Sequence, residues 1–181
     1  MGDRDVDDGK NLCNQGADPS RGKPLRKEQQ DKESVTRADV EAAATRLLAR
    51  RGHAREELKR KLRRRGFEES MISQVLDHFV ERGIVDDRRF ADEQAAILVR
   101  KCWGPVQIRK KLRARGVDDR FIDEALDEFD APAIWRDHAR QRLQARFGAA
   151  AELDERDQRR AYRHLRYRGF RPAMIRRLLF D

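Results

Sequence analysis

The sequence predicts an all-α protein built from three tandem three-helix repeats. Composition is the first observation: of 181 residues, 41% are charged, 38% are hydrophobic and only 7% are aromatic. Abundant Leu, Ala, Arg and Glu favour helices over strands. Because the apolar fraction is too small for one large core, thin cores in small stacked units fit better.

An internal repeat is the second observation, and it sets the number of units. Three segments carry a glycine with apolar residues four positions before it and one, six and ten positions after it. The glycines are 50 and then 53 residues apart, and each suits the position just after a helix, where φ is positive. These glycines are Gly66, Gly116 and Gly169.

Repeat one is predicted to cover residues 36–85, after a disordered N-terminal tail, residues 1–35, that lacks apolar periodicity. Thr36 and Asp39 have the spacing of a capping box at the first helix. The second helix follows Ala54, where the missing Ser or Thr cap predicts a weaker helix start.

Repeat two is predicted to cover residues 86–131. Asp86 and Asp87 are good N-cap candidates for its first helix. Gly104 and Pro105 place a proline at the first position of its second helix, where proline is favoured.

Repeat three, strongly basic, is predicted to cover residues 132–181. Its first two helices are joined by a connection near residues 148–153 that is longer than in the other copies. Asp154 is expected to cap the second helix, and Pro172 to start the last one.

Catalytic and targeting signals are missing from the sequence. It contains no glycine-rich phosphate loop, zinc-protease motif or nucleophile elbow. It also has no signal peptide and no apolar run of membrane-spanning length, and its two cysteines predict a reducing cytoplasm. We therefore expect a cytoplasmic, non-enzymatic protein without cofactor, metal or membrane contact. The four histidines, which fall on different predicted helices, are His53, His78, His138 and His164.

The net charge of +9 lies in the predicted folded part, because residues 1–37 sum to zero. Residues 38–85 carry +3, residues 86–131 carry −1 and residues 132–181 carry +7. A basic folded body favours a polyanionic partner, although a solubilising surface is the simpler alternative.

The second helix of every repeat is basic. Cations in its last turn offset the helix dipole, but this does not explain the earlier ones. The candidate contacts to a partner protein or DNA are Lys59, Arg60, Arg63, Arg64, Arg109, Lys110, Arg113, Arg159, Arg160, Arg163, Arg166 and Arg168, with Arg176 and Arg177 from the last helix.

The third helix is acidic in repeats one and two but not in repeat three. DNA phosphates would repel such helices, which disfavours sequence-specific reading of a duplex. We expect the acidic helices to face away from the contact surface or to meet a basic partner surface.

Several segments resemble the RecX family of regulators of the RecA recombinase. They are Asp-Asp-Arg-Arg-Phe-Ala at residues 86–91, Gly-Pro-x-x-Ile-Arg-x-x-Leu-x-x-Arg-Gly at 104–116, Leu-Lys-Arg-Lys-Leu at 58–62 and Arg-Gly-Phe at 168–170. The resemblance extends over about residues 36–181.

The resemblance implies an elongated, curved array of repeats that binds in the groove of the RecA–DNA filament. Such a protein suppresses ATP hydrolysis, strand exchange and recombination, and has no cofactor. We expect a monomer with RecA as partner and weak DNA contact. The alternative is a helical-repeat protein that binds single-stranded or duplex DNA nonspecifically, without RecA.

Overall fold

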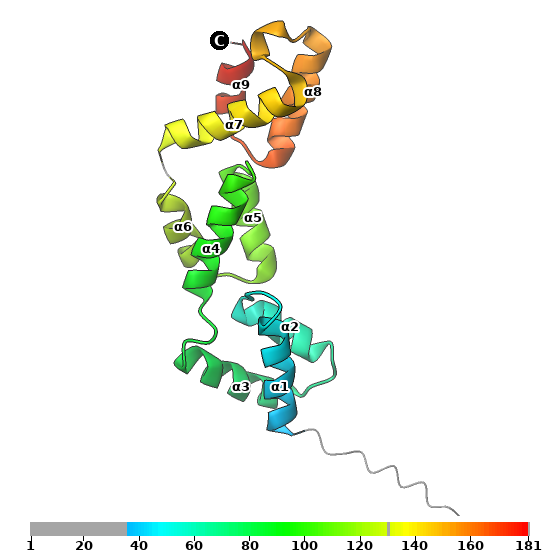
Figure 1. Ribbon diagram of the computed structural model, residues 1–181, viewed down its shortest axis with the longest axis vertical. Coiled ribbons are helices and arrows are strands. Elements are labelled where there is room, and N and C mark those ends of the chain that lie inside the picture. The colour runs from blue at the N-terminus through cyan, green and yellow to red at the C-terminus, as the bar shows by residue number, and fades with distance from the viewer. Residues whose placement is uncertain (1–35, 130, 181) are drawn as a thin grey trace, which may run out of the picture. The chain divides into compact units, whose positions relative to one another are not determined.

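The computed structural model describes residues 36–129 and 131–180, and all regular structure in that part is helical. Three three-helix bundles follow one another in chain order (Figure 1), which confirms the predicted fold class. The predicted tail, residues 1–35, lies outside the described residues.

The bounds of the helices are as follows. The first bundle contains α1 (Arg37–Leu48), α2 (Arg55–Arg63) and α3 (Glu69–Glu81). The second contains α4 (Asp87–Arg100), α5 (Pro105–Arg115) and α6 (Asp119–Asp127). The third contains α7 (Pro132–Phe147), the short 3-10 helix η1 (Ala150–Glu152), α8 (Glu155–Arg168) and α9 (Pro172–Phe180).

The three repeat glycines end the second helix of each bundle in the same way. Their φ angles are +86°, +87° and +92°, as predicted for the position after a helix end. At Gly169, the glycine N–H donates to Arg166 O at 3.0 Å and the next N–H, of Phe170, donates to Leu165 O at 3.1 Å. The same pair of bonds recurs at the other two glycines. This is a Schellman motif, whose apolar contact explains the repeated residues four before and one after the glycine.

The predicted helix starts are confirmed. Thr36 and Asp39 form the capping box of α1, and the side chains of Asp86 and Asp154 cap α4 and α8. The start of α2 is different, because Ala54 supplies no side-chain cap and is fully buried. Its place is taken by Asp87 of the next bundle, whose carboxylate accepts a hydrogen bond from Arg55 N at 2.7 Å. The sequence therefore indicated a missing cap correctly but could not show its replacement.

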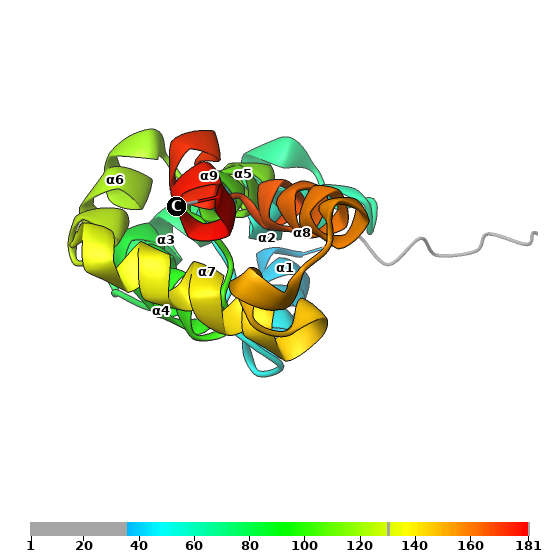
Figure 2. The ribbon, with the colours of Figure 1, turned by 90° about the horizontal axis from the view of Figure 1, so that it is seen from above.

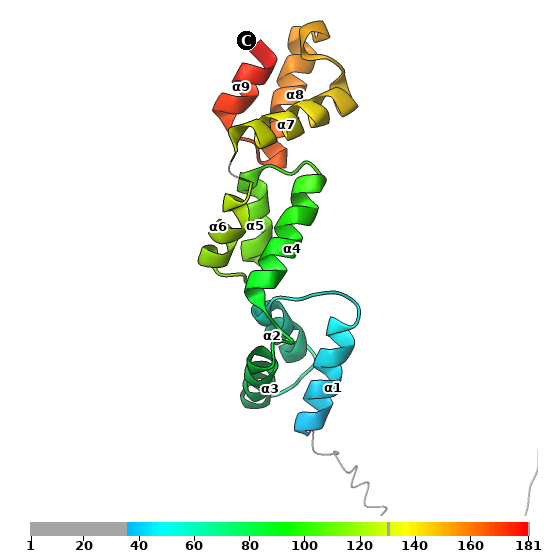
Figure 3. The ribbon, with the colours of Figure 1, turned by 60° about the vertical axis from the view of Figure 1, so that its left-hand side comes forward.

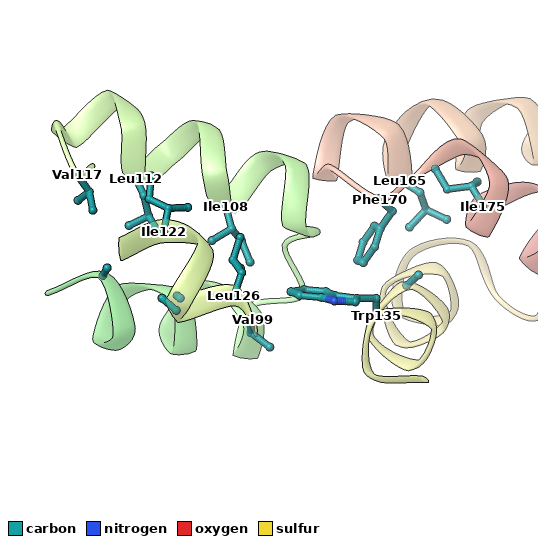
Figure 4. Close-up of a cluster of buried hydrophobic side chains, with 14 of the residues drawn as sticks. Val99, Ile108, Leu112, Val117, Ile122, Leu126, Trp135, Leu165, Phe170 and Ile175 are labelled. Carbon is teal, nitrogen blue, oxygen red and sulfur yellow. The ribbon is translucent and has the colours of Figure 1, made fainter. Parts of the chain in front are cut away.

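The buried side chains form two cores. One belongs to the first bundle and includes Leu58, Leu62 and Ile72. The other runs through the second and third bundles and includes Ala54 at the start of α2. Trp135 packs edge-on against Phe129 with ring centroids 6.4 Å apart. Figure 4 shows Trp135 between the side chains of the second bundle and those of the third. Repeats two and three thus share apolar packing.

No helix within the described residues is both long and apolar enough to cross a membrane.

Candidate binding surface

The second helices of the three repeats meet end to end (Figure 3). At the contact between α8 and α5, Gly104 N donates to Arg168 O at 2.8 Å, and Val106 N donates to Gly169 O at 3.2 Å. Free carbonyls at one helix end thereby satisfy free N–H groups at the start of another, with the dipoles aligned. The approach requires glycine, since a Cβ on Gly104 would lie well under 3 Å from the Gly169 backbone.

Arg168 and Trp103 close the same junction. The Arg168 guanidinium lies over the Trp103 ring, 3.8 Å from its centroid, and donates to the carbonyls of Cys102 and Lys101. Burial is the main reason that the pKa of Arg168 is lowered, with Arg142 adding to the effect. Arg168, a sequence-based candidate for partner contact, is therefore engaged within the chain.

The junction between α5 and α2 is held by side chains. Arg60 Nη2 donates to Ala114 O at 2.9 Å. A Cβ on Gly116 would lie 2.5 Å from Glu56 Cβ, so α5 ends directly against the first turn of α2. Two of the candidate cations, Arg60 and Arg168, thus connect neighbouring repeats.

An ionic cluster with a buried His53 and Glu57 lies next to the junction between α5 and α2. His53 Nδ1 lies 3.2 Å from Glu57 Oε2, and Arg51 donates to both oxygens of the same carboxylate. Burial works to raise the pKa of Glu57, but hydrogen bonds from Arg51 and His53 outweigh it and lower the pKa to about 2. Burial lowers the pKa of His53 despite Glu57.

A basic cleft of about 430 Å³ opens beside this cluster. Its cations can hold an anion such as a phosphate group, because arginine forks match phosphate oxygens bidentately. The lining residues are Glu57, Arg60, Lys61, Arg63, Arg64, Ala114 and Arg115.

Six of the fourteen candidate cations have acidic partners inside their own repeat. Glu69 of α3 pairs with both Lys59 and Arg63, at 2.5 and 2.7 Å. The second bundle repeats the arrangement, with Arg109 paired to Asp123 and Arg113 to Asp119 of α6. In α8, Arg159 pairs with Glu155 and Arg160 with Asp157. The expectation that the acidic third helices face away was therefore wrong for Glu69, Asp119 and Asp123, which neutralise cations of the adjacent second helix.

Six candidate cations remain exposed without an ion-pair partner among residues 36–129 and 131–180. They define the free cation set that a polyanionic partner can reach. The set comprises Arg64 just after α2, Lys110 of α5, Arg163 and Arg166 of α8, and Arg176 and Arg177 of α9.

Sequence reasoning named Asp87 and Gly104 only as parts of helix starts, and it missed that these two residues and Trp103 join the repeats. It also missed a groove in the third bundle lined by Arg136 and Arg140. The long connection before α8 was the one sequence signal for that groove. No group of three or more His, Cys, Asp or Glu side chains suited to a metal ion occurs in the part of the chain that the structure describes.

Comparison with known proteins gives two family matches. The family model of the RecX first three-helix domain matches residues 42–79, and that of the RecX second three-helix domain matches residues 86–126.

Curated relatives extend the likeness. Regulatory protein RecX of Halorhodospira halophila is 42% identical over 137 residues, which cover 76% of this chain and 84% of the relative. Regulatory protein RecX of Pseudomonas savastanoi pv. phaseolicola is 38% identical over 140 residues, covering 77% and 89%.

Solved structures support the fold. The crystal structure of RecX from Lactobacillus salivarius has a TM-score of 0.66 at 20% identity, covering 79% of this chain and 94% of that one. A second crystal structure, of regulatory protein RecX, has a TM-score of 0.63 at 22% identity, covering 79% and 72%.

Proposed function

Because the chain belongs to the RecX family of regulatory proteins, we propose that it is a non-enzymatic cytoplasmic regulator that binds the RecA–DNA filament as a monomer. Bound in the filament groove, it inhibits RecA ATPase activity, strand exchange and recombination. The family resemblance supplies the partner, and the free cation set supplies the surface.

One observation carries the proposal. The helices α2, α5 and α8 meet end to end, and each has a free cation: Arg64 just after α2, Lys110 on α5 and Arg163 on α8. A repeating polyanionic partner such as a protein-coated DNA strand can meet such successive cations together, and each close contact releases counterions.

The test compares two double variants of α8. Arg163→Ala with Arg166→Ala removes two free cations, whereas Arg159→Ala with Arg160→Ala removes two that are already paired to Glu155 and Asp157. We expect the first variant to inhibit the DNA-dependent ATPase of RecA much less than the second. Full inhibition by a correctly folded Arg163→Ala, Arg166→Ala variant would overturn this assignment of the surface.

The basic cleft favours a second candidate, nonspecific DNA binding without RecA. Its arginines, Arg60, Arg63 and Arg64 among them, suit backbone phosphates. A salt titration on single-stranded DNA separates the two functions. Tight binding with a steep log–log slope on DNA alone supports the second, whereas weak DNA binding beside tight filament binding supports the first.

A further inference from the structure

The third bundle contains an open groove of about 590 Å³ lined by residues of α7 and α9. Figure 2 shows these two helices side by side. Leu143 and Leu178 contribute its apolar floor together with Met174. One end is formed by Ala149 and Ala150, where the chain enters η1. The long connection that distinguishes repeat three in the sequence therefore builds a wall of this groove.

Four exposed arginines surround the floor: Arg136 and Arg140 of α7, Arg171 just before α9, and Arg177. Arg140 pairs with Asp137 at 3.2 Å, an exposed pair of adjacent turns that contributes little. Within the described residues, no carboxylate pairs with the other three. The lining therefore suits a ligand that is both anionic and apolar.

The lining chemistry separates a protein segment from a nucleic acid. No aromatic side chain lines the groove, so nucleic-acid bases would find no platform for stacking. Leucine and methionine side chains are instead the surface against which an amphipathic helix lays its apolar face, and methionine adapts to differently shaped partners.

We propose that this arginine-rimmed groove binds an acidic amphipathic helix of a partner protein, with apolar side chains on the Leu143–Met174–Leu178 floor and carboxylates against the arginines. Arginine forks bind carboxylates bidentately, which favours an acidic helix over a neutral one. The groove shares Arg177 with the free cation set, but the observation that carries the proposed function lies on α2, α5 and α8, so either proposal can fail alone.

A synthetic probe tests the groove in the full-length protein. The probe is a fluorescent peptide of about 15 residues, four helical turns, with leucine along one face and glutamate elsewhere. A second peptide replaces the leucines with glutamine, and a third replaces the glutamates with lysine. Fluorescence anisotropy should give saturable binding for the leucine–glutamate peptide, and at least about tenfold weaker binding for either control.

Two matched pairs of substitutions locate the binding. Ala149→Trp fills the groove, whereas Ala151→Trp adds the same side chain to an exposed neighbour that does not line it. Likewise, Arg136→Glu reverses a rim charge and Arg156→Glu reverses an exposed charge on α8 outside the groove. We expect the groove variant of each pair to bind about tenfold more weakly than its control, with unchanged helix content by circular dichroism.

Several results would overturn the proposal. Equal binding by Ala149→Trp and Ala151→Trp would place the peptide elsewhere, and equal binding of the leucine-free peptide would reduce the site to a charge effect. Competition by oligo-dT that depends on Arg136 would assign the rim to nucleic acid. Peptide binding only after deletion of residues 1–35 would assign the groove to the chain's own N-terminal segment. Retained RecA inhibition by Ala149→Trp would leave the proposed function standing in each case.

Discussion

The Asp87 carboxylate of α4 accepts a hydrogen bond at 2.7 Å from the backbone N–H of Arg55, the first residue of α2. A residue of the second bundle thus caps a helix of the first. Burial raises the pKa of Asp87, and the Arg55 N–H opposes this effect by stabilising the charged form. The fully buried Ala54 leaves the cap to this neighbour.

Replacing Asp87 by alanine should lower the free energy of unfolding by about 1 kcal/mol, the usual cost of losing a helix cap. Asp87→Asn should retain most of it, because the amide oxygen still accepts the bond. Glu93→Ala, an exposed change on the same helix, is the control. Urea unfolding measures all three, and an Asp87→Ala variant as stable as the control would refute the capping role.

The repeat glycines offer a matched test of the end-to-end packing. Gly66 and Gly169 occupy the same position of the Schellman motif, with φ of +86° and +92°. A Cβ on Gly66 meets nothing within 4 Å, whereas one on Gly169 would clash with Gln107.

Gly66→Ala should therefore cost only the backbone strain, about 1 kcal/mol. Gly169→Ala should cost a further 1–3 kcal/mol, roughly the price of overpacking. Chemical denaturation monitored by circular dichroism provides both values. Equal losses at the two glycines would mean that α8 does not pack against the start of α5.

The sequence predicted the local features of the fold well and the junctions poorly. Schellman motifs and N-caps depend on residues within about five positions, so the Gly66 and Thr36 patterns were visible in the chain. The Asp87–Arg55 bond spans 32 residues and the Arg168–Cys102 bond spans 66. A periodicity over neighbouring positions cannot predict pairs that lie so far apart in the sequence.

The candidate surface was predicted in the same uneven way. Helix-two cations were recognised by composition, but their neutralisation by acids such as Glu69 depends on which helix faces pack together. Charge counts therefore identified the basic helices without distinguishing free cations from paired ones.

Arg166 and Arg168, two positions apart on α8, should respond differently to alanine. Arg168→Ala loses the contact with Trp103 and the bonds to two carbonyls, and should destabilise the protein by about 1–3 kcal/mol. Arg166→Ala removes an exposed cation and should leave stability within about 0.5 kcal/mol.

Thermal unfolding compares the two variants. The tryptophan fluorescence emission of Arg168→Ala should also differ from that of the unmodified protein, because the substitution removes the guanidinium that lies over the Trp103 ring. Identical stabilities would assign Arg168 to the exterior surface with Arg166.

Acid should destabilise the junction at Glu57. Its pKa falls from 4.5 to about 2 in the folded chain, since hydrogen bonds from Arg51 and His53 outweigh burial. A depressed folded pKa gives stability that is present above pH 4.5 and is lost as the pH falls towards 2. His53, whose pKa burial lowers, adds a loss that begins below its ordinary value of 6.5.

Glu57→Gln should flatten the stability profile between pH 4.5 and 2. It should also enlarge the loss due to His53 below pH 6.5, because Glu57 opposes the lowering of the His53 pKa by burial. Urea midpoints across this range measure the effect, with Glu93→Gln as an exposed control. A profile for Glu57→Gln that parallels the unmodified chain would show that Glu57 does not carry the acid response.

Neutralising Glu69 should strengthen polyanion binding, because this carboxylate holds both Lys59 and Arg63. Hydrogen bonds from these cations lower the pKa of Glu69, so it stays charged at neutral pH. Glu69→Gln releases two cations next to the basic cleft. Each new phosphate contact should steepen the slope of log binding constant against log salt concentration, measured on single-stranded DNA, by about 0.7.

The control is Glu81→Gln, which changes an exposed acid on the same helix that has no ion-pair partner in the described chain. Both changes alter the net charge equally, so a steeper slope only in Glu69→Gln identifies the released cations as the cause. Equal slopes would mean that α3 affects binding through net charge alone.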